Sequence, residues 1–196
     1  MKAEGRLFFG ILIILMGTGR LWAQEPLGAA KTVTWMRYEF DAGAMSIMSP
    51  VKLTPTDIRT ENETIAKQLM YGGSIGLVTF VTSYLVLKTD SDRWSTPERD
   101  NFVRGFWKGM ESTYNENIKG NPHNWATQLS DMRSVAVSGL PATELLYKVG
   151  PSNGHLRIVL KGHRCYIASI LTSREDHSYI AEKFFKSFVI TARTPR

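Results

Sequence analysis

Residues 142–172, ATELLYKVGPSNGHLRIVLKGHRCYIASILT, decide the fold of this chain. Apolar and polar residues alternate along most of this stretch, which is interrupted by the turn signals GPSNG at 150–154 and GH at 162–163. Alternation with a period of two is typical of strands with one buried face, and Gly, Pro and Asn clusters mark turns. The stretch therefore predicts three consecutive strands, over 142–149, 155–161 and 164–172. Because the turns between them are short, we expect neighbouring strands to pair antiparallel.

A helical pattern precedes these strands and another follows them. Ser95-Thr96-Pro97 is a strong helix start, because a hydroxyl side chain can cap free amides and proline fits the first turn. Apolar residues then recur at helical spacing, which predicts a helix over 97–117. Ile180, Phe184 and Phe188 recur four residues apart. They predict a closing helix over 174–188 that covers the sheet with one apolar face.

The other segments are assigned mostly to strands. β-Branched and aromatic residues favour strands over 32–40, 44–48, 74–87 and 128–137. Residues 51–62 are predicted as a loop, 64–71 fit either a helix or a strand, and Gly72-Gly73 is predicted as a turn. The segment 74–87 is one strand bent at Thr82-Ser83, or two strands. Because strands cluster apart from helices, the predicted fold class is α+β: an antiparallel sheet flanked by a long central helix and a C-terminal helix.

The first 23 residues have the composition of an export signal. Lys2 and Arg6 precede an apolar run over 7–16, and Ala23 precedes the polar start Gln24-Glu25. A membrane-spanning helix needs about 20 apolar residues, and this run is half that length. We therefore predict a signal peptide over 1–23, cleaved after Ala23, and a secreted protein that is periplasmic or extracellular. A linker over 24–31, one domain over 32–191 and a polar tail over 192–196 complete the predicted organisation.

Charge and cysteine content exclude some classes of function. The chain has 24 Lys and Arg against 18 Asp and Glu. Removing the leader takes three basic residues and one acidic residue, so the predicted mature protein has a charge of +4. This excess is too small to predict nucleic-acid binding, and no second apolar stretch reaches membrane-spanning length. Cys165 is the only cysteine. It cannot form an intrachain disulfide, and its strand pattern predicts a small buried residue.

Several short motifs in the C-terminal half match one known family. They are Gly139-Leu140-Pro141, Leu156-Arg157-Ile158, GHRCY at 162–166 and FFKSF at 184–188. With the order of elements from about residue 34 to 190, they make the chain similar to the PsbP-like α/β/α sandwich family, named for an extrinsic subunit of photosystem II. Members of that family are mostly non-catalytic accessory or binding proteins, so the resemblance implies a non-enzymatic function. The N-terminal half departs from the family pattern, because no paired aromatic–Pro segment follows the first predicted hairpin.

No motif with its own chemistry stands out. The sequence has no Gly-rich phosphate loop, no Gly-x-Ser-x-Gly and no His-Glu-x-x-His. The histidines His123, His155, His163 and His177 are scattered, whereas a metal site needs three or four ligands that converge. We therefore expect no metal site and no cofactor. A hydrolase with an unrecognised site is the least favoured class.

Two candidate binding surfaces remain. Lys148, Arg157, Lys161 and Arg164 fall on strands that we expect to share the open face of the sheet. This face could dock a protein partner or an anionic envelope component, or it is an ordinary solvated face whose charges protect exposed strands. If it is open, reversing Arg157 and Lys161 to Glu is expected to abolish binding without unfolding the protein. The alternative is a small-molecule pocket between the sheet and the first helix, lined by Trp107, Met110 and Tyr114.

Overall fold

A computed structural model describes residues 34–58, 63–117, 127–172 and 178–191. The predicted signal peptide, linker and polar tail therefore lie outside the described residues. Within the described part of the chain, no helix is long and apolar enough to cross a membrane.

Seven antiparallel strands form the central sheet, in the order β3-β4-β5-β9-β8-β7-β6. Their bounds are β3 Thr54–Ile58, β4 Ile65–Ile75, β5 Val78–Leu87, β6 Thr127–Val137, β7 Leu140–Val149, β8 Ser152–Lys161 and β9 Arg164–Thr172. The three strands predicted within 142–172 are confirmed as β7, β8 and β9, which pair as successive hairpins. They place the polar residues of the candidate surface in the middle of the sheet.

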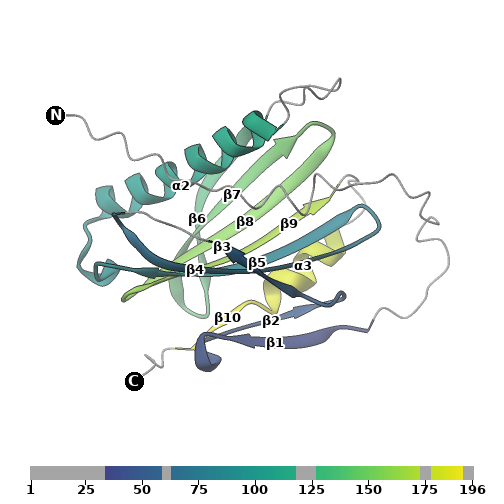
Figure 1. The fold of residues 1–196 in the computed structure, drawn as a ribbon, viewed down its shortest axis with the longest axis horizontal. Coiled ribbons are helices and arrows are strands. Elements are labelled where there is room, and N and C mark those ends of the chain that lie inside the picture. Colours follow the sequence, from purple (N-terminus) through teal and green to yellow (C-terminus); the bar gives the residue numbers. More distant parts are fainter. Residues whose placement is uncertain (1–33, 59–62, 118–126, 173–177, 192–196) are drawn as a thin grey trace.

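Helix α2 (Thr96–Asn117) covers one face of this sheet (Figure 1). At its start, Oε2 of Glu98 accepts hydrogen bonds of 2.7 Å from both the backbone nitrogen and the hydroxyl of Ser95. Val103, Phe106 and Met110 then point at helical spacing into a core shared with β5, β7, β8 and β9. The predicted helix is thus confirmed, with the expected apolar side toward the sheet.

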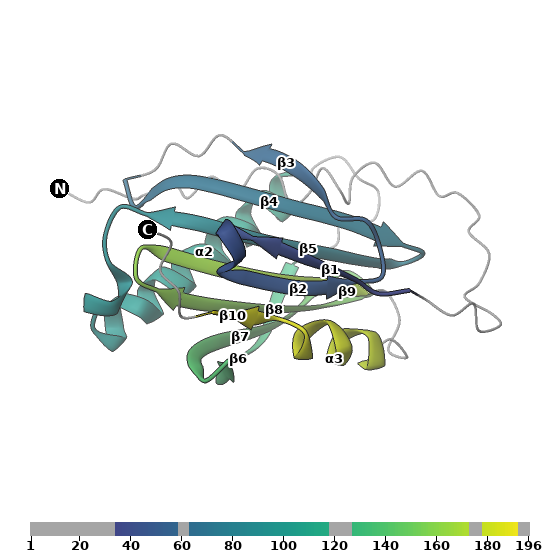
Figure 2. The same ribbon diagram turned by 90° about the horizontal axis from the view of Figure 1, so that it is seen from below.

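The opposite face is covered by helix α3 and a second, smaller sheet (Figure 2). This sheet has the order β1-β2-β10, and its members are β1 Met36–Phe40, β2 Met45–Ser49 and β10 Val189–Ile190. Helix α3 (Ser178–Lys186) contributes Phe184, which is fully buried, and the neighbouring Phe185. The architecture is therefore α+β in three layers: α2, the seven-stranded sheet, and α3 with the small sheet.

The N-terminal half differs from its predicted elements at three places. The predicted loop contains edge strand β3, where Pro55 is tolerated because an edge strand need not donate on its free side. Gly72-Gly73 lies inside β4, not in a turn; a Cβ at Gly73 would collide with the Lys52 carbonyl, so glycine is needed there for close chain packing. The segment 74–87 is split at Gly76 (φ 56°) and Leu77, not at Thr82-Ser83.

Candidate functional site

The four basic residues predicted to form a docking surface do share one face of the sheet. Arg157 lies opposite Glu144 of β7, and Lys148 follows Glu144 at an even spacing on the same strand. Lys161 lies opposite Arg164 across the β8–β9 turn. Because directly opposed residues share a face and side chains alternate along each strand, all four point to the α3 side. This face is partly covered by α3 and the small sheet, so it is not the open face that we expected.

Arg157 forms an ion pair with a buried carboxylate. Its Nε lies 2.8 Å from Oε1 of Glu144, whose side chain is only 2% exposed. The other oxygen, Oε2, accepts a hydrogen bond of 2.8 Å from Nε of Arg133 on β6. The Arg157 guanidinium also lies over the Phe185 ring of α3, 4.6 Å from its centroid. Arg157 therefore links β7, β8 and α3 in addition to carrying a charge.

The two arginines keep Glu144 ionised. Burial alone would raise the pKa of the Glu144 carboxyl, but hydrogen bonds and charges from Arg157 and Arg133 outweigh burial and lower that pKa below its usual range. Next to this group, the His155 ring stacks on Phe185, and burial lowers the pKa of His155. The cluster thus combines one buried carboxylate with two guanidinium groups, and Asp131 on β6 also interacts with the charge of Arg133.

Arg164 pairs with Asp41, which begins the short helix η1 (Asp41–Gly43) between β1 and β2. Asp41 Oδ2 lies 2.9 Å from Arg164 Nε and accepts a hydrogen bond of 3.0 Å from the Tyr166 hydroxyl. Asp41 and Ala42 both have positive φ, at 50° and 53°, an unfavourable conformation for residues with a Cβ. The bonds to Asp41 therefore join this constrained turn of the small sheet to β9 of the large sheet.

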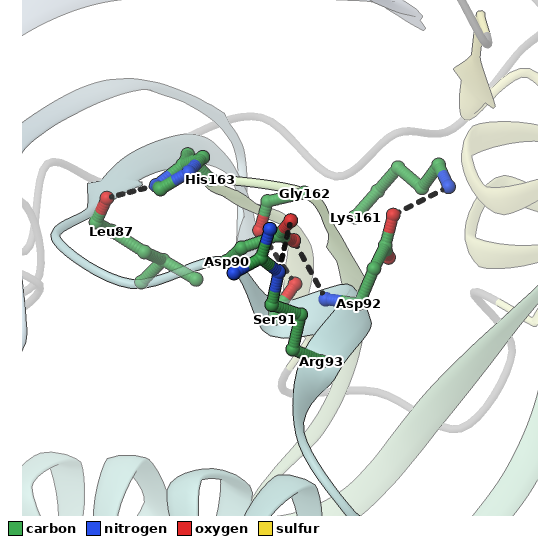
Figure 3. A network of polar contacts seen from close by, with 8 residues as sticks. All are labelled: Leu87, Asp90, Ser91, Asp92, Arg93, Lys161, Gly162 and His163. Atoms are coloured by element: carbon green, nitrogen blue, oxygen red, sulfur yellow. Dashed lines mark hydrogen bonds and ion pairs between the residues drawn. The ribbon is translucent and has the colours of Figure 1, made fainter.

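Lys161 belongs to a polar network at the β8–β9 turn (Figure 3). Its Nζ lies 2.7 Å from Oδ2 of Asp92 in the short helix η2 (Ser91–Arg93), and this hydrogen bond is the main cause that lowers the pKa of Asp92. In the same network, both the backbone nitrogen and the hydroxyl of Ser91 donate to the Gly162 carbonyl at 2.8 Å. His163 Nδ1 lies 3.2 Å from the Leu87 carbonyl. These contacts fix the connection between β5 and α2.

Three of the four predicted docking residues therefore hold parts of the fold together. Lys148 differs from them, because it is exposed at the far end of β7. The acidic partners Glu144, Asp41 and Asp92 were not identified from the sequence. Of these three, only Glu144 could have been found from the sequence, because the alternation within 142–149 places it on the same face as Lys148.

The three side chains that were expected to line a pocket between the sheet and α2 are buried in the core. Trp107, Met110 and Tyr114 are 6%, 1% and 3% exposed. Trp107 packs on the Tyr147 ring with centroids 5.5 Å apart, and the Tyr147 hydroxyl lies 3.2 Å from the Ser169 hydroxyl. These residues form part of the core beneath α2, so they do not line an open surface pocket.

Cys165 is a core residue on the α2 side of β9, as predicted. Burial raises the pKa of its thiol, so the nucleophilic thiolate is disfavoured. Of the histidines, His155 and His163 are described and have the contacts given above, whereas His123 and His177 lie outside the described residues. Among the described residues, no group of three His, Cys, Asp or Glu side chains lies close enough to hold a metal ion.

Comparison with known proteins identifies the fold. No family model and no curated protein matches the sequence. The solution structure of cyanobacterial PsbP from Synechocystis superposes with a TM-score of 0.52 at 14% identity, covering 85% of this chain and all of the other. The fold is PsbP-like. The resemblance inferred from the C-terminal motifs is therefore confirmed at the level of fold.

Two more distant structures are also similar. A Bacteroides thetaiotaomicron protein has a TM-score of 0.40 at 10% identity, covering 80% of this chain and 48% of its own. A protein of unknown function from Pseudomonas aeruginosa has a TM-score of 0.37 at 14% identity, covering 74% of this chain and 97% of its own.

Proposed function

We propose that the protein is an exported, non-enzymatic accessory protein that docks a protein partner or an anionic component of the cell envelope. The export signal over 1–23 supports the location, and the PsbP-like fold supports an accessory role by analogy with the family. Identity of 14% to the cyanobacterial protein carries no partner over to this chain.

The observation that carries the docking proposal is the uneven distribution of charge on the α3 side of the sheet. Arg164 and Lys161 each have a carboxylate partner. At the β6–β8 side, Arg133 and Arg157 share the carboxylate of Glu144, and Asp131, two residues before Arg133 on β6, also interacts with the Arg133 charge. The Arg133 side chain is 56% exposed. Exposed Lys148 makes three basic groups against two carboxylates on this side, a net charge of +1, so we assign docking to this side of the sheet.

A pull-down from envelope extract tests this assignment with two matched charge reversals. Lys148→Glu removes the exposed charge, and Lys108→Glu reverses an exposed charge on α2, across the sheet. We expect wild type and Lys108→Glu to retain the same partner at low salt and to lose it at high salt, because salt screens exposed charges. Lys148→Glu should retain little at either salt concentration. The same partners bound by all three proteins, regardless of salt, would contradict docking at this side.

Mass spectrometry of the protein from its native host tests export. We expect a mature terminus at Gln24, because the leader ends at Ala23. An exported chain that still begins at Met1 would indicate that the leader is retained as an anchor.

A further inference from the structure

The two edges of the seven-stranded sheet differ in their capacity to pair with another strand. β3 is short and contains Pro55, two features that block edge pairing. β6, at the other edge, spans eleven residues without proline. Asp131 and its neighbour Ser130 are both exposed, as are Arg133 and Ser134, so β6 is accessible on both faces. Among the described residues, β7 is the only strand that pairs with β6, so the other edge of β6 presents a row of backbone donors and acceptors.

The turn after β6 determines which backbone groups face outward. Ser138 and Gly139 have φ of 53° and 77°, which is the pattern of a two-residue type I′ hairpin turn. Val137 and Leu140, which flank that turn, therefore form a hydrogen-bonded pair, and bonding to β7 alternates along β6 from there. Arg133 lies four residues before Val137, so its backbone N–H and C=O also point toward β7.

The residues between the inward-facing ones present their backbone N–H and C=O to the free edge. Met132 and Ser134 are two of these outward-facing residues. The side chain of Met132 packs toward the α2-side core, which holds its backbone in place. The backbone N–H and C=O of Met132 point away from β7. A partner strand would therefore bond to the backbone at positions 132 and 134.

The sequence of β6 is self-complementary around Met132. If two β6 strands pair antiparallel about a two-fold axis at Met132, Asp131 of each copy lies opposite Arg133 of the other. Opposite charges across an antiparallel pair are stabilising, whereas a register centred on Ser134 places Arg133 opposite Val135 and leaves the charges unmatched. The bulge between Leu129 and Asp131 ends regular pairing, so the paired segment is short.

We propose that the β6 edge binds a second copy of this chain, with the two-fold axis at Met132. The two seven-stranded sheets then form one continuous sheet. A two-fold axis perpendicular to the sheet places the α3 sides of both copies on the same surface of the joined sheet. Both copies of Lys148 therefore lie on that surface. The inference does not depend on docking of an envelope partner, since it rests on the backbone and charges of β6 alone.

Sedimentation equilibrium of the purified protein over a concentration series tests the dimer with a proline variant. Ser134→Pro removes an outward N–H, which an edge strand tolerates in the monomer, and Ser134→Ala keeps that N–H as the matched control. We expect a wild-type dimer, at least about a tenfold larger dissociation constant for Ser134→Pro, and no change for Ser134→Ala. Circular dichroism checks that each variant is folded.

Disulfide cross-linking tests the register independently of the proline variant. Opposed residues of a hydrogen-bonded antiparallel pair have Cα atoms about 5.5 Å apart, within the range that a disulfide spans. Met132→Cys should therefore cross-link two copies under mild oxidation faster than Ser134→Cys, because the two copies of residue 134 are displaced from each other along the strands in this register. The native Cys165 is buried and should not interfere. A wild-type chain that stays monomeric up to about 1 mM, an undiminished dimer of Ser134→Pro, or faster cross-linking through residue 134 would each overturn the proposal.

Discussion

The aromatic ring of Tyr147 lies across the backbone of Gly154, its partner on the neighbouring strand β8. The two residues are directly paired, and a Cβ built on Gly154 would overlap the Tyr147 ring. Without that Cβ, the ring crosses β8 and its hydroxyl reaches Ser169 on β9. Gly154 was assigned to a turn from the sequence, but it lies within β8 to make room for this side chain.

Gly154→Ala should therefore destabilise the protein. Tyr147 is 2% exposed and held by Trp107, so the ring cannot move away, and overpacking of this kind costs about 1–3 kcal/mol. Urea unfolding of the single variants and of the double variant with Tyr147→Leu measures the coupling. The alanine should cost clearly less in the Tyr147→Leu background, and an equal cost in both backgrounds would show that the overlap is unimportant.

Helix α3 should be essential for folding. Phe184 is fully buried between α3 and β5, where it packs on Phe80 with ring centroids 5.2 Å apart. Removing a buried phenylalanine side chain costs about 3–5 kcal/mol, a large part of the total stability of about 5–15 kcal/mol. Phe184→Ala should lower the urea midpoint strongly, whereas Glu182→Ala on the exposed side of α3 should not. Similar midpoints for the two variants would make α3 peripheral.

Cys165 should react slowly in the folded protein. Its side chain is fully buried and burial raises the pKa of the thiol, so both access and ionisation are unfavourable. Labelling with a thiol reagent should be slow in buffer and fast in denaturant. Rapid labelling in buffer at neutral pH would indicate an exposed, activated thiol.

The contribution of ionised Glu144 to stability should be visible in the pH dependence of the unfolding free energy. Its folded-state pKa is lowered, so its ion pairs stabilise the protein above the unfolded pKa of about 4.3, and this contribution is lost as the pH falls through the lower folded value. Glu144→Gln should therefore be much less stable than wild type at pH 7. The gap between the two unfolding free energies should narrow at pH 3. A gap of constant size would mean that ionisation of Glu144 does not contribute.

The C-terminal half was predictable from sequence because its signals are local. Alternation and turn residues located β7 to β9, and the apolar spacing of Phe184 and Phe188 located the closing helix. The N-terminal half depends on long-range contacts: Gly73 is required by the chain at Lys52, and β2 pairs with β10 from the far end of the sequence.

The same contrast applies to the candidate site. Strand alternation correctly placed Lys148 and Arg157 on one face. It could not show that Asp41, more than a hundred residues earlier in the chain, would pair with Arg164, or that α3 would cover Arg157. Charges that looked solvated in sequence are therefore paired in the fold. The expectation that Arg157 can be changed to Glu without unfolding the protein is therefore wrong for this fold. We now expect that change to destabilise the protein.

The most direct measurement is a comparison of the unfolding free energies of Arg157→Glu and Lys148→Glu. Arg157→Glu would place a second carboxylate against buried Glu144, and breaking a buried ion pair costs about 3–5 kcal/mol. Lys148 is exposed, so its reversal should change stability by less than about 0.5 kcal/mol. We expect a severely destabilised or unfolded Arg157→Glu protein and a wild-type-like Lys148→Glu protein. Two variants of equal, near-wild-type stability would show that Arg157 belongs to an open docking face and does not hold β7, β8 and α3 together.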